Sequence, residues 1–166
     1  LEYKGDIGPT TLRAAYASQS DAGDSNLNYD ADYYVLEGSV AFNPVTVKLG
    51  YEVLGSDDGV GFKTPYATLH GFQGWADKFL TTPADGIEDF YLGLSGRLGG
   101  VTLGATYHDF QAEENSADFG TEIDLVATWP VNDLLSFQLH YADFSSDNRS
   151  RYDDTRKAWF TVNVTL

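Results

Sequence analysis

Residues alternate between apolar and polar types along most of this chain. In the clearest stretch, 45–53, the odd positions hold Val, Val, Leu, Tyr and Val, and the even positions hold Thr, Lys, Gly and Glu. A period of two residues is typical of a β-strand with one apolar and one polar face. Residues 1–7 look like a short strand, and the alternation recurs at 10–19, 34–42, 90–98, 101–110, 123–129, 135–141 and 158–166. The sequence therefore predicts an all-β protein of about eight to nine strands.

Charge and composition remove several classes of function. The 10 basic and 25 acidic residues give a formal net charge of −15, which makes a nucleic acid a poor partner. The chain has no cysteine, so disulfides and cysteine-ligated zinc are excluded. It also has no run of about 18 apolar residues, so it has no membrane-spanning helix, although membrane barrels cross by alternating strands instead.

Short and long connections take turns along the chain. Short turns are predicted at Asn43-Pro44, Gly99-Gly100 and 130–133. Longer, largely acidic segments that are typical of loops occupy 21–32, 113–118 and 145–156. Outer-membrane barrels have short periplasmic turns, long extracellular loops and strands of about 9–11 residues. The pattern favours an antiparallel up-and-down transmembrane β-barrel. Residues 1–166 are expected to form either a single barrel domain or a portion of a larger barrel.

The two faces of the predicted strands differ in charge and in aromatic content. Five aromatic residues share the apolar face and lie near strand ends, as the two interfacial girdles of a membrane barrel require: Tyr16, Tyr34, Tyr51, Trp129 and Tyr141. Turning the other face to lipid would place Arg13, Lys48 and Arg97 there, at roughly 2–4 kcal/mol each near the midplane. We therefore expect the polar face to line a pore through Arg13, Glu37, Lys48, Glu52, Arg97, His108, Glu122, Asp124 and His140.

One long segment, at about 55–88, interrupts the alternation. It far exceeds the usual connection of about 4–6 residues, which is a common property of functional loops. Four of its residues are candidates for solute contact at a constriction, namely His70, Trp75, Asp77 and Lys78. Alternatively, burial of Trp75 and Phe79 simply pins the loop to the wall. The sequence leaves both inward folding and outward projection open.

The last strand ends in a pattern that resembles the assembly signal of outer-membrane barrels. Alternate apolar residues, Phe160, Val162 and Val164, lead to the terminal Leu166, where the usual residue is phenylalanine. We expect this strand to be recognised by the outer-membrane assembly machinery, with membrane lipid and lipopolysaccharide as further partners.

Several segments resemble bacterial outer-membrane proteins of the alginate-export family. They are 64–65 (TP), 68–70 (TLH), 74–80 (GWADKFL), 82–86 (TPADG), 89–92 (DFYL), 107–110 (YHDF) and 120–124 (GTEID). The resemblance implies a porin that passes an anionic polysaccharide or another small polar or anionic solute. Members of that family are larger barrels, which implies that this chain is the C-terminal part of one.

Strand number separates the remaining hypotheses. Eight strands closed alone leave an interior that side chains nearly fill, whereas 16–18 strands hold an aqueous channel. The first case predicts a non-conducting outer-membrane barrel that serves as an anchor or interaction surface, and the second predicts a pore. A soluble ligand-binding barrel is a third alternative, which the aromatic girdles oppose. No nucleophile elbow or spaced calcium-binding loop occurs, so neither an enzyme nor a metal or other cofactor is expected.

Overall fold

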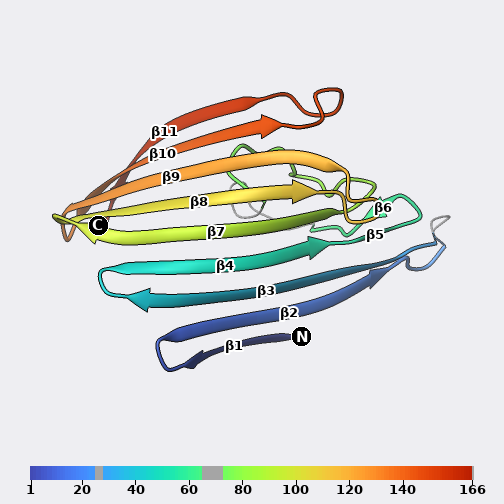
Figure 1. Ribbon diagram of the computed structural model, residues 1–166, viewed down its shortest axis with the longest axis horizontal. Helices are drawn as coiled ribbons and strands as arrows, with labels where there is room; N and C mark the ends of the chain where they lie inside the picture. Colours follow the sequence, from blue (N-terminus) through green and yellow to red (C-terminus); the bar gives the residue numbers. More distant parts are fainter. Residues whose placement is uncertain (25–27, 65–72, 166) are drawn as a thin grey trace.

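The computed structural model describes residues 1–24, 28–64 and 73–165, and in them one antiparallel sheet dominates. Its nine strands lie side by side in chain order (Figure 1). They are β1 (Glu2–Ile7), β2 (Thr10–Ser20), β3 (Asp30–Phe42), β4 (Val45–Leu54), β7 (Ile87–Leu98), β8 (Val101–Gln111), β9 (Asp118–Asn132), β10 (Leu135–Ser146) and β11 (Thr155–Val164). The all-β, up-and-down prediction is confirmed. No helix among the described residues could cross a membrane.

The strands are longer at the loop end than the alternation predicts. β3 begins at Asp30 rather than 34, β7 at Ile87 rather than 90 and β9 at Asp118 rather than 123. Polar residues predicted as loop therefore pair across strands, as Ser20 does with Asp30. An alternating pattern develops only in the part of a strand whose two faces meet different surroundings. Backbone pairing between strands can continue beyond that part, so the strands are longer than the pattern predicts.

The long segment after β4 also contains structure that its sequence did not predict. Two residue pairs form a small hairpin from β5 (Ser56–Asp57) and β6 (Val60–Gly61), and Asp30 N–H donates to Asp57 Oδ2 at 2.8 Å. Such short strands are too brief for an alternating pattern to develop. His70 lies outside the described residues.

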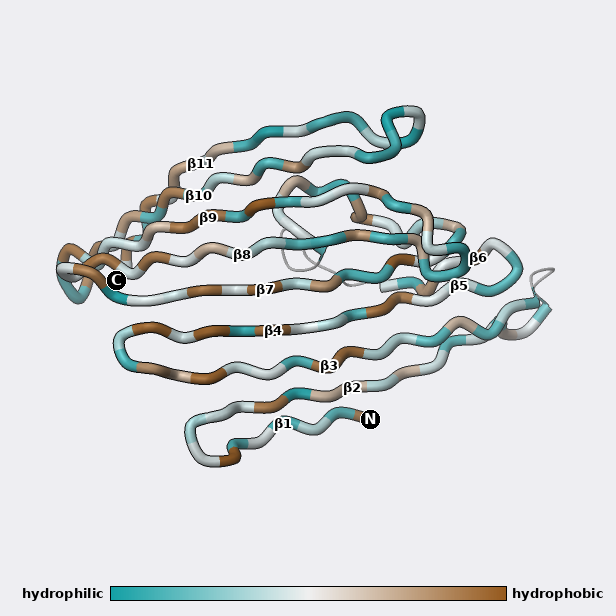
Figure 2. The backbone as a smooth tube through the Cα atoms, viewed as in Figure 1, coloured by the Kyte–Doolittle hydropathy of each residue, from teal (hydrophilic) through white to brown (hydrophobic). Residues whose placement is uncertain are grey.

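The sheet is open, and β1 and β11 form its two edges. Along each strand, hydrophobic and hydrophilic residues interchange, and the loops at the right-hand end are largely hydrophilic (Figure 2). The face that carries the leucines is exposed: Leu36 is 63% and Leu49 is 50% accessible. We call this the outward face and the opposite one the inward face.

Aromatic residues border the outward face at two levels. Tyr34 and Phe42 lie eight residues apart on β3 and are both exposed. At about 3.3 Å per residue they are separated by roughly 26 Å along the strand. This compares with an apolar band of about 25 Å in outer-membrane barrels. Exposed or half-exposed aromatic residues on neighbouring strands continue the rows, with Tyr16, Tyr51, Phe90, Tyr107 and Tyr141 at one level and Trp129, Phe137 and Phe160 at the other.

Candidate functional site

The described part of the long loop after β6, residues 73–86, folds against the inward face; we call it the inner loop. Three of its groups donate to wall carboxylates. Gln73 Nε2 donates to Glu52 Oε2 at 2.8 Å, Trp75 N–H to Asp124 Oδ2 at 3.1 Å and Ala76 N–H to Glu122 Oε1 at 2.7 Å. The structure therefore answers the question that the sequence left open, since this part of the loop lies inside.

Gly74 allows the inner loop to come this close to the wall. Its φ is +79°, a conformation that favours glycine, and a Cβ atom there would lie 2.7 Å from the Glu122 carboxyl group. Both the backbone conformation and the available space therefore require glycine at this position.

The inner loop is also tied to the last strand. Lys157 Nζ lies 2.6 Å from Asp77 Oδ2, and Lys78 Nζ donates to Thr155 Oγ1 at 2.8 Å. Both pairs are part-buried. Asp77 and Lys78, which the sequence suggested as solute contacts, thus make contacts that hold the loop.

An aromatic cluster buries the end of the inner loop. Phe79 is 6% exposed, and its ring centroid lies 4.8 Å from that of Phe110, 5.7 Å from Phe119, 6.0 Å from Phe144 and 5.1 Å from Tyr152. The loop therefore has a hydrophobic core of its own against β8, β9 and β10.

A second aromatic group lies beside this core. The rings of His140 and Trp159 stack at 4.9 Å, and Trp75 meets them edge-on at 5.0 and 6.0 Å. His140, a predicted pore-lining residue, therefore packs against the loop instead of lining the hollow described next.

A polar hollow of about 490 Å³ remains between the inner loop and the wall. Lys4, Arg13 and Lys48 from β1, β2 and β4 form its basic side. Arg13 Nε lies 3.0 Å from Glu2 Oε1, and Lys48 Nζ lies 3.2 Å from Glu37 Oε2. The Arg13 and Lys48 side chains keep 32% and 46% of their surface exposed, so their charge reaches the water of the hollow.

Carboxylates on the other side of the hollow are buried and hydrogen-bonded. Asp89 is only 2% exposed, and His108 Nδ1 lies 2.9 Å from its Oδ1 atom. Glu52 is 6% exposed and accepts from the Tyr33 hydroxyl at 2.8 Å. The hollow thus presents exposed cations opposite carboxylates whose oxygens already have protein partners.

The sheet brings most of the predicted pore residues to one place. The predicted pore-lining residues that line the hollow are Arg13, Glu37, Lys48, Glu52 and His108, and Trp75, a candidate from the loop, lines it with them. Glu122 and Asp124 lie beneath the inner loop, 0% and 1% exposed. Arg97 is exposed at the short-turn end of β7 and lies outside the hollow. Face parity can be read from sequence, but which part of that face the loop covers depends on contacts between distant residues.

Further lining residues were missed by the sequence argument: Lys4, Gln73, Gly74, Asp89, Tyr91 and Thr106. Tyr91 donates to Glu37 Oε2 at 2.7 Å, and its ring covers Gly50, where a Cβ atom would lie 2.1 Å from the ring. The alternation places Lys4 and Tyr91 on the inward face, so the sequence contained a signal for these two residues. It contained none for Asp89, because β7 was predicted to begin after that residue.

An ion pair outside the strands fastens the far end of the inner loop. Arg151, in the β10–β11 loop, donates from Nη1 and Nη2 to Asp85 Oδ2 and Oδ1 at 2.7 and 2.6 Å. These bonds are the main reason that the pKa of Asp85 is lowered. A lowered carboxyl pKa adds stability at pH values above the ordinary value of about 3.9, and this stability is lost as pH falls through the lowered pKa.

Arg151→Ala is therefore expected to loosen residues 81–86 at neutral pH by about 1 kcal/mol, because both partners keep some contact with water. Hydrogen exchange should show faster exchange of the Gly86 and Glu114 amides, which donate to Pro83 and Asp85. Acidification through the lowered pKa of Asp85 should bring the wild type towards the variant.

Arg149→Ala is the matched control, since Arg149 pairs with Asp154 within its own loop. Equal effects of the two substitutions on the Gly86 amide would contradict a specific role for the Arg151–Asp85 pair.

No group of three or more His, Asp or Glu side chains that could hold a metal ion occurs in residues 1–24, 28–64 and 73–165. The charged and polar lining of the hollow offers charge attraction, hydrogen bonding and steric restriction.

Comparison with known protein families identifies a family for this chain. The model of the family described as "Gram-negative porin" covers residues 1–165. No curated protein and no solved structure matches the chain.

Proposed function

Because this chain belongs to the Gram-negative porin family, whose members lie in the bacterial outer membrane, we propose that the polar hollow is the constriction of its channel. The family is one of channels, and the inner loop supplies the feature that restricts passage. One observation carries the proposal: residues 73–79 pack against the polar, inward face and leave a hollow of about 490 Å³ beside them.

The solutes that fit best are small polar molecules, with a preference for monoanions. The charges most exposed to water in the hollow are cationic, since the Lys48 side chain is 46% exposed while Asp89 is 2% exposed. A long polyanion fits less well, because the chain as a whole carries a net charge of −15. The resemblance to the alginate-export family implies a channel for an anionic polysaccharide or a small anionic solute. Of these two, we propose only the small anionic solute for this protein.

The channel also needs a closed wall. Backbone groups along a free sheet edge have no hydrogen-bond partner in hydrocarbon, so open edges do not occur in contact with lipid. We propose that β1 and β11 each pair with a further strand, which would enlarge the interior beyond that of a filled eight-stranded barrel.

The second candidate is a non-conducting barrel that acts as an anchor or interaction surface. The observation that favours it is the extent of packing under the inner loop, where Phe79 reaches the buried rings of Phe110 and Phe144. The two candidates differ in one measurement, the ion conductance of the refolded protein in a planar lipid bilayer. Steady conductance supports the channel, and a folded barrel without conductance supports the anchor.

Lys48→Glu should change the ion selectivity of the channel. Reversing an exposed charge in the hollow alters the energy of a passing monovalent ion by about 1–2 kcal/mol at 4–8 Å in water, in opposite directions for an anion and a cation. The anion-to-cation permeability ratio should therefore fall by roughly 30-fold or more. The reversal potential in a salt gradient measures this ratio.

Arg97→Glu makes the same change of charge outside the hollow and serves as the matched control. If it moved the reversal potential as much as Lys48→Glu, the hollow would not be the selective part of the path.

A further inference from the structure

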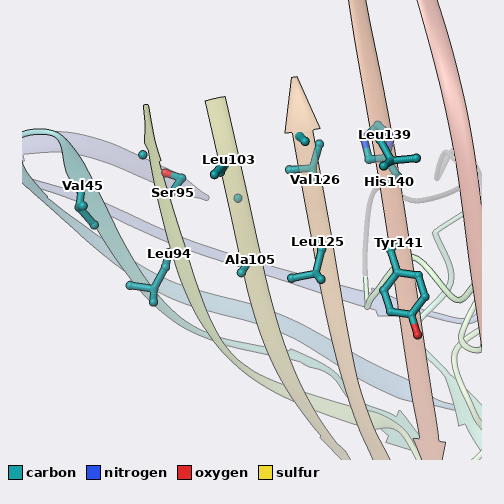
Figure 3. Close-up of a pocket in the computed structure, with 13 residues that line it drawn as sticks. Val45, Leu94, Ser95, Leu103, Ala105, Leu125, Val126, Leu139, His140 and Tyr141 are labelled. Atoms are coloured by element: carbon teal, nitrogen blue, oxygen red, sulfur yellow. The ribbon is translucent and has the colours of Figure 1, made fainter. Parts of the chain in front are cut away.

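A second hollow, of about 590 Å³, lies on the opposite, outward face and has no part in the proposed channel. It crosses β7, β8, β9 and β10 (Figure 3). Small residues make its floor, and large apolar residues stand around them. Across neighbouring strands Ala105 pairs with Leu125, and Leu103 with Ala127. We call this hollow the outer groove.

The outer groove lies in the half of the sheet near the short turns. Leu103 and Ala105 are two and four residues beyond the start of β8, which places them roughly 7 and 13 Å along that strand at about 3.3 Å per residue. Short turns face the periplasm in outer-membrane barrels, so the groove lies at the depth of the periplasmic leaflet.

The outer groove is mostly apolar, and the polar residues of its lining are Ser95, His140 and Tyr141 (Figure 3). Leu94, Leu125 and Leu139 border it and are 49%, 42% and 54% exposed. The hydroxyl of Tyr141, at one end, donates to Asp143 Oδ2 at 2.8 Å. An occupant of this groove therefore gains from apolar contact and shape rather than from polar groups.

We propose that the outer groove binds one acyl chain of a periplasmic-leaflet phospholipid. The membrane location supplies this ligand, and the depth of the groove favours phospholipid over lipopolysaccharide, which occupies the opposite leaflet. A second protein copy fits less well, because a specific interface buries about 800 Å² per partner and includes hydrogen bonds, whereas this groove is mostly apolar. The proposal rests on the outer-membrane location and is independent of conductance.

Trp129 provides a reporter for this site. It is 53% exposed on the outward face of β9, two residues from Ala127, whereas Trp75 and Trp159 lie on the inward face against the loop. Bromine atoms on a phospholipid acyl chain should therefore quench Trp129 alone. The protein is first placed in vesicles that contain brominated and ordinary phosphatidylethanolamine, and ordinary lipid is then added. A brominated chain bound in the groove should exchange more slowly than the surrounding lipid. Part of the quenching of Trp129 should therefore persist after the dilution.

Filling the groove tests the assignment. The double variant Ala105→Leu with Ala127→Leu should lose the persistent quenching by at least about fivefold, the size of a modest loss of packing. Ala105→Leu alone should give part of this loss and serves if the double variant does not fold. Ala158→Leu is the matched control, because Ala158 lies on the outward face of β11 outside the groove and should leave the quenching unchanged.

Three results would overturn the proposal. The first is identical quenching in the wild type and both filled variants. The second is displacement of the brominated chain by lipopolysaccharide but not by phosphatidylethanolamine, which would assign the groove to the other leaflet. The third is a loss of dimers or higher oligomers in the filled variants without a change in quenching, which would assign the groove to a protein partner.

Discussion

Phe79→Ala should release the inner loop and raise the single-channel conductance of the reconstituted protein. Phe79 is 6% exposed and contacts four aromatic rings, so its truncation is expected to cost about 3–5 kcal/mol of loop docking. The polar contacts of the loop contribute about 1 kcal/mol each, so they cannot fully replace this loss. Conductance in a planar bilayer and hydrogen exchange at the Ala76 amide, which donates to Glu122, would measure the change.

Leu80→Ala is the matched control, because the neighbouring Leu80 is 56% exposed. It should leave both readouts close to those of the wild type. A folded Phe79→Ala protein with normal conductance and a protected Ala76 amide would show that the aromatic cluster does not hold the loop.

Gly74→Ala should have the second largest effect, also through the inner loop. An alanine at φ +79° costs roughly 1–2 kcal/mol in backbone energy. Its Cβ atom would in addition meet the Glu122 carboxyl at 2.7 Å, so residues 74–76 must move away from β9. We expect docking to weaken by about 2–4 kcal/mol in total, with a wider constriction and higher conductance.

Gly59→Ala separates the two causes. Gly59 has a similar φ, +75°, but nothing lies within 4 Å of the position of an added Cβ atom. This control therefore carries the backbone cost without the clash, in a hairpin away from Glu122. If Gly59→Ala changed conductance as much as Gly74→Ala, the contact between the loop and Glu122 would not set the width of the channel.

The sheet could be predicted from sequence because its cause is local. Alternation in 45–53 reports two faces in different surroundings, and β4 spans Val45–Leu54. The start of β7 could not be read in this way, since Glu88 and Asp89 are charged residues that continue the strand beyond its alternating part. The predicted strand stopped at the edge of the apolar band, whereas the hydrogen-bonded strand continues beyond that edge.

The site could be predicted only as a face. Alternation puts Lys48 and Glu52 on the same face, but the sequence contains no sign that Lys48 is open to water and Glu52 is covered. That difference comes from the inner loop, whose donors lie 46 and 49 residues from Glu122 and Asp124. Contacts at such separation leave no periodic pattern, and the enabling residue, Gly74, is one glycine among 17.

The contacts of the inner loop also impose an order on folding. The loop follows β6 in the chain, yet its anchors on β9 and β11 are made later, and Asp77 and Lys157 are 80 residues apart. Pairings between distant residues form slowly, because closure of a long chain segment costs entropy before the contact is gained. The hairpins of the sheet can form from neighbouring strands, while the loop completes its contacts only when β11 has joined the sheet. We therefore expect the interior to reach its final width only when β11 is in place, so that a protein stalled before that step would leak more than the finished one.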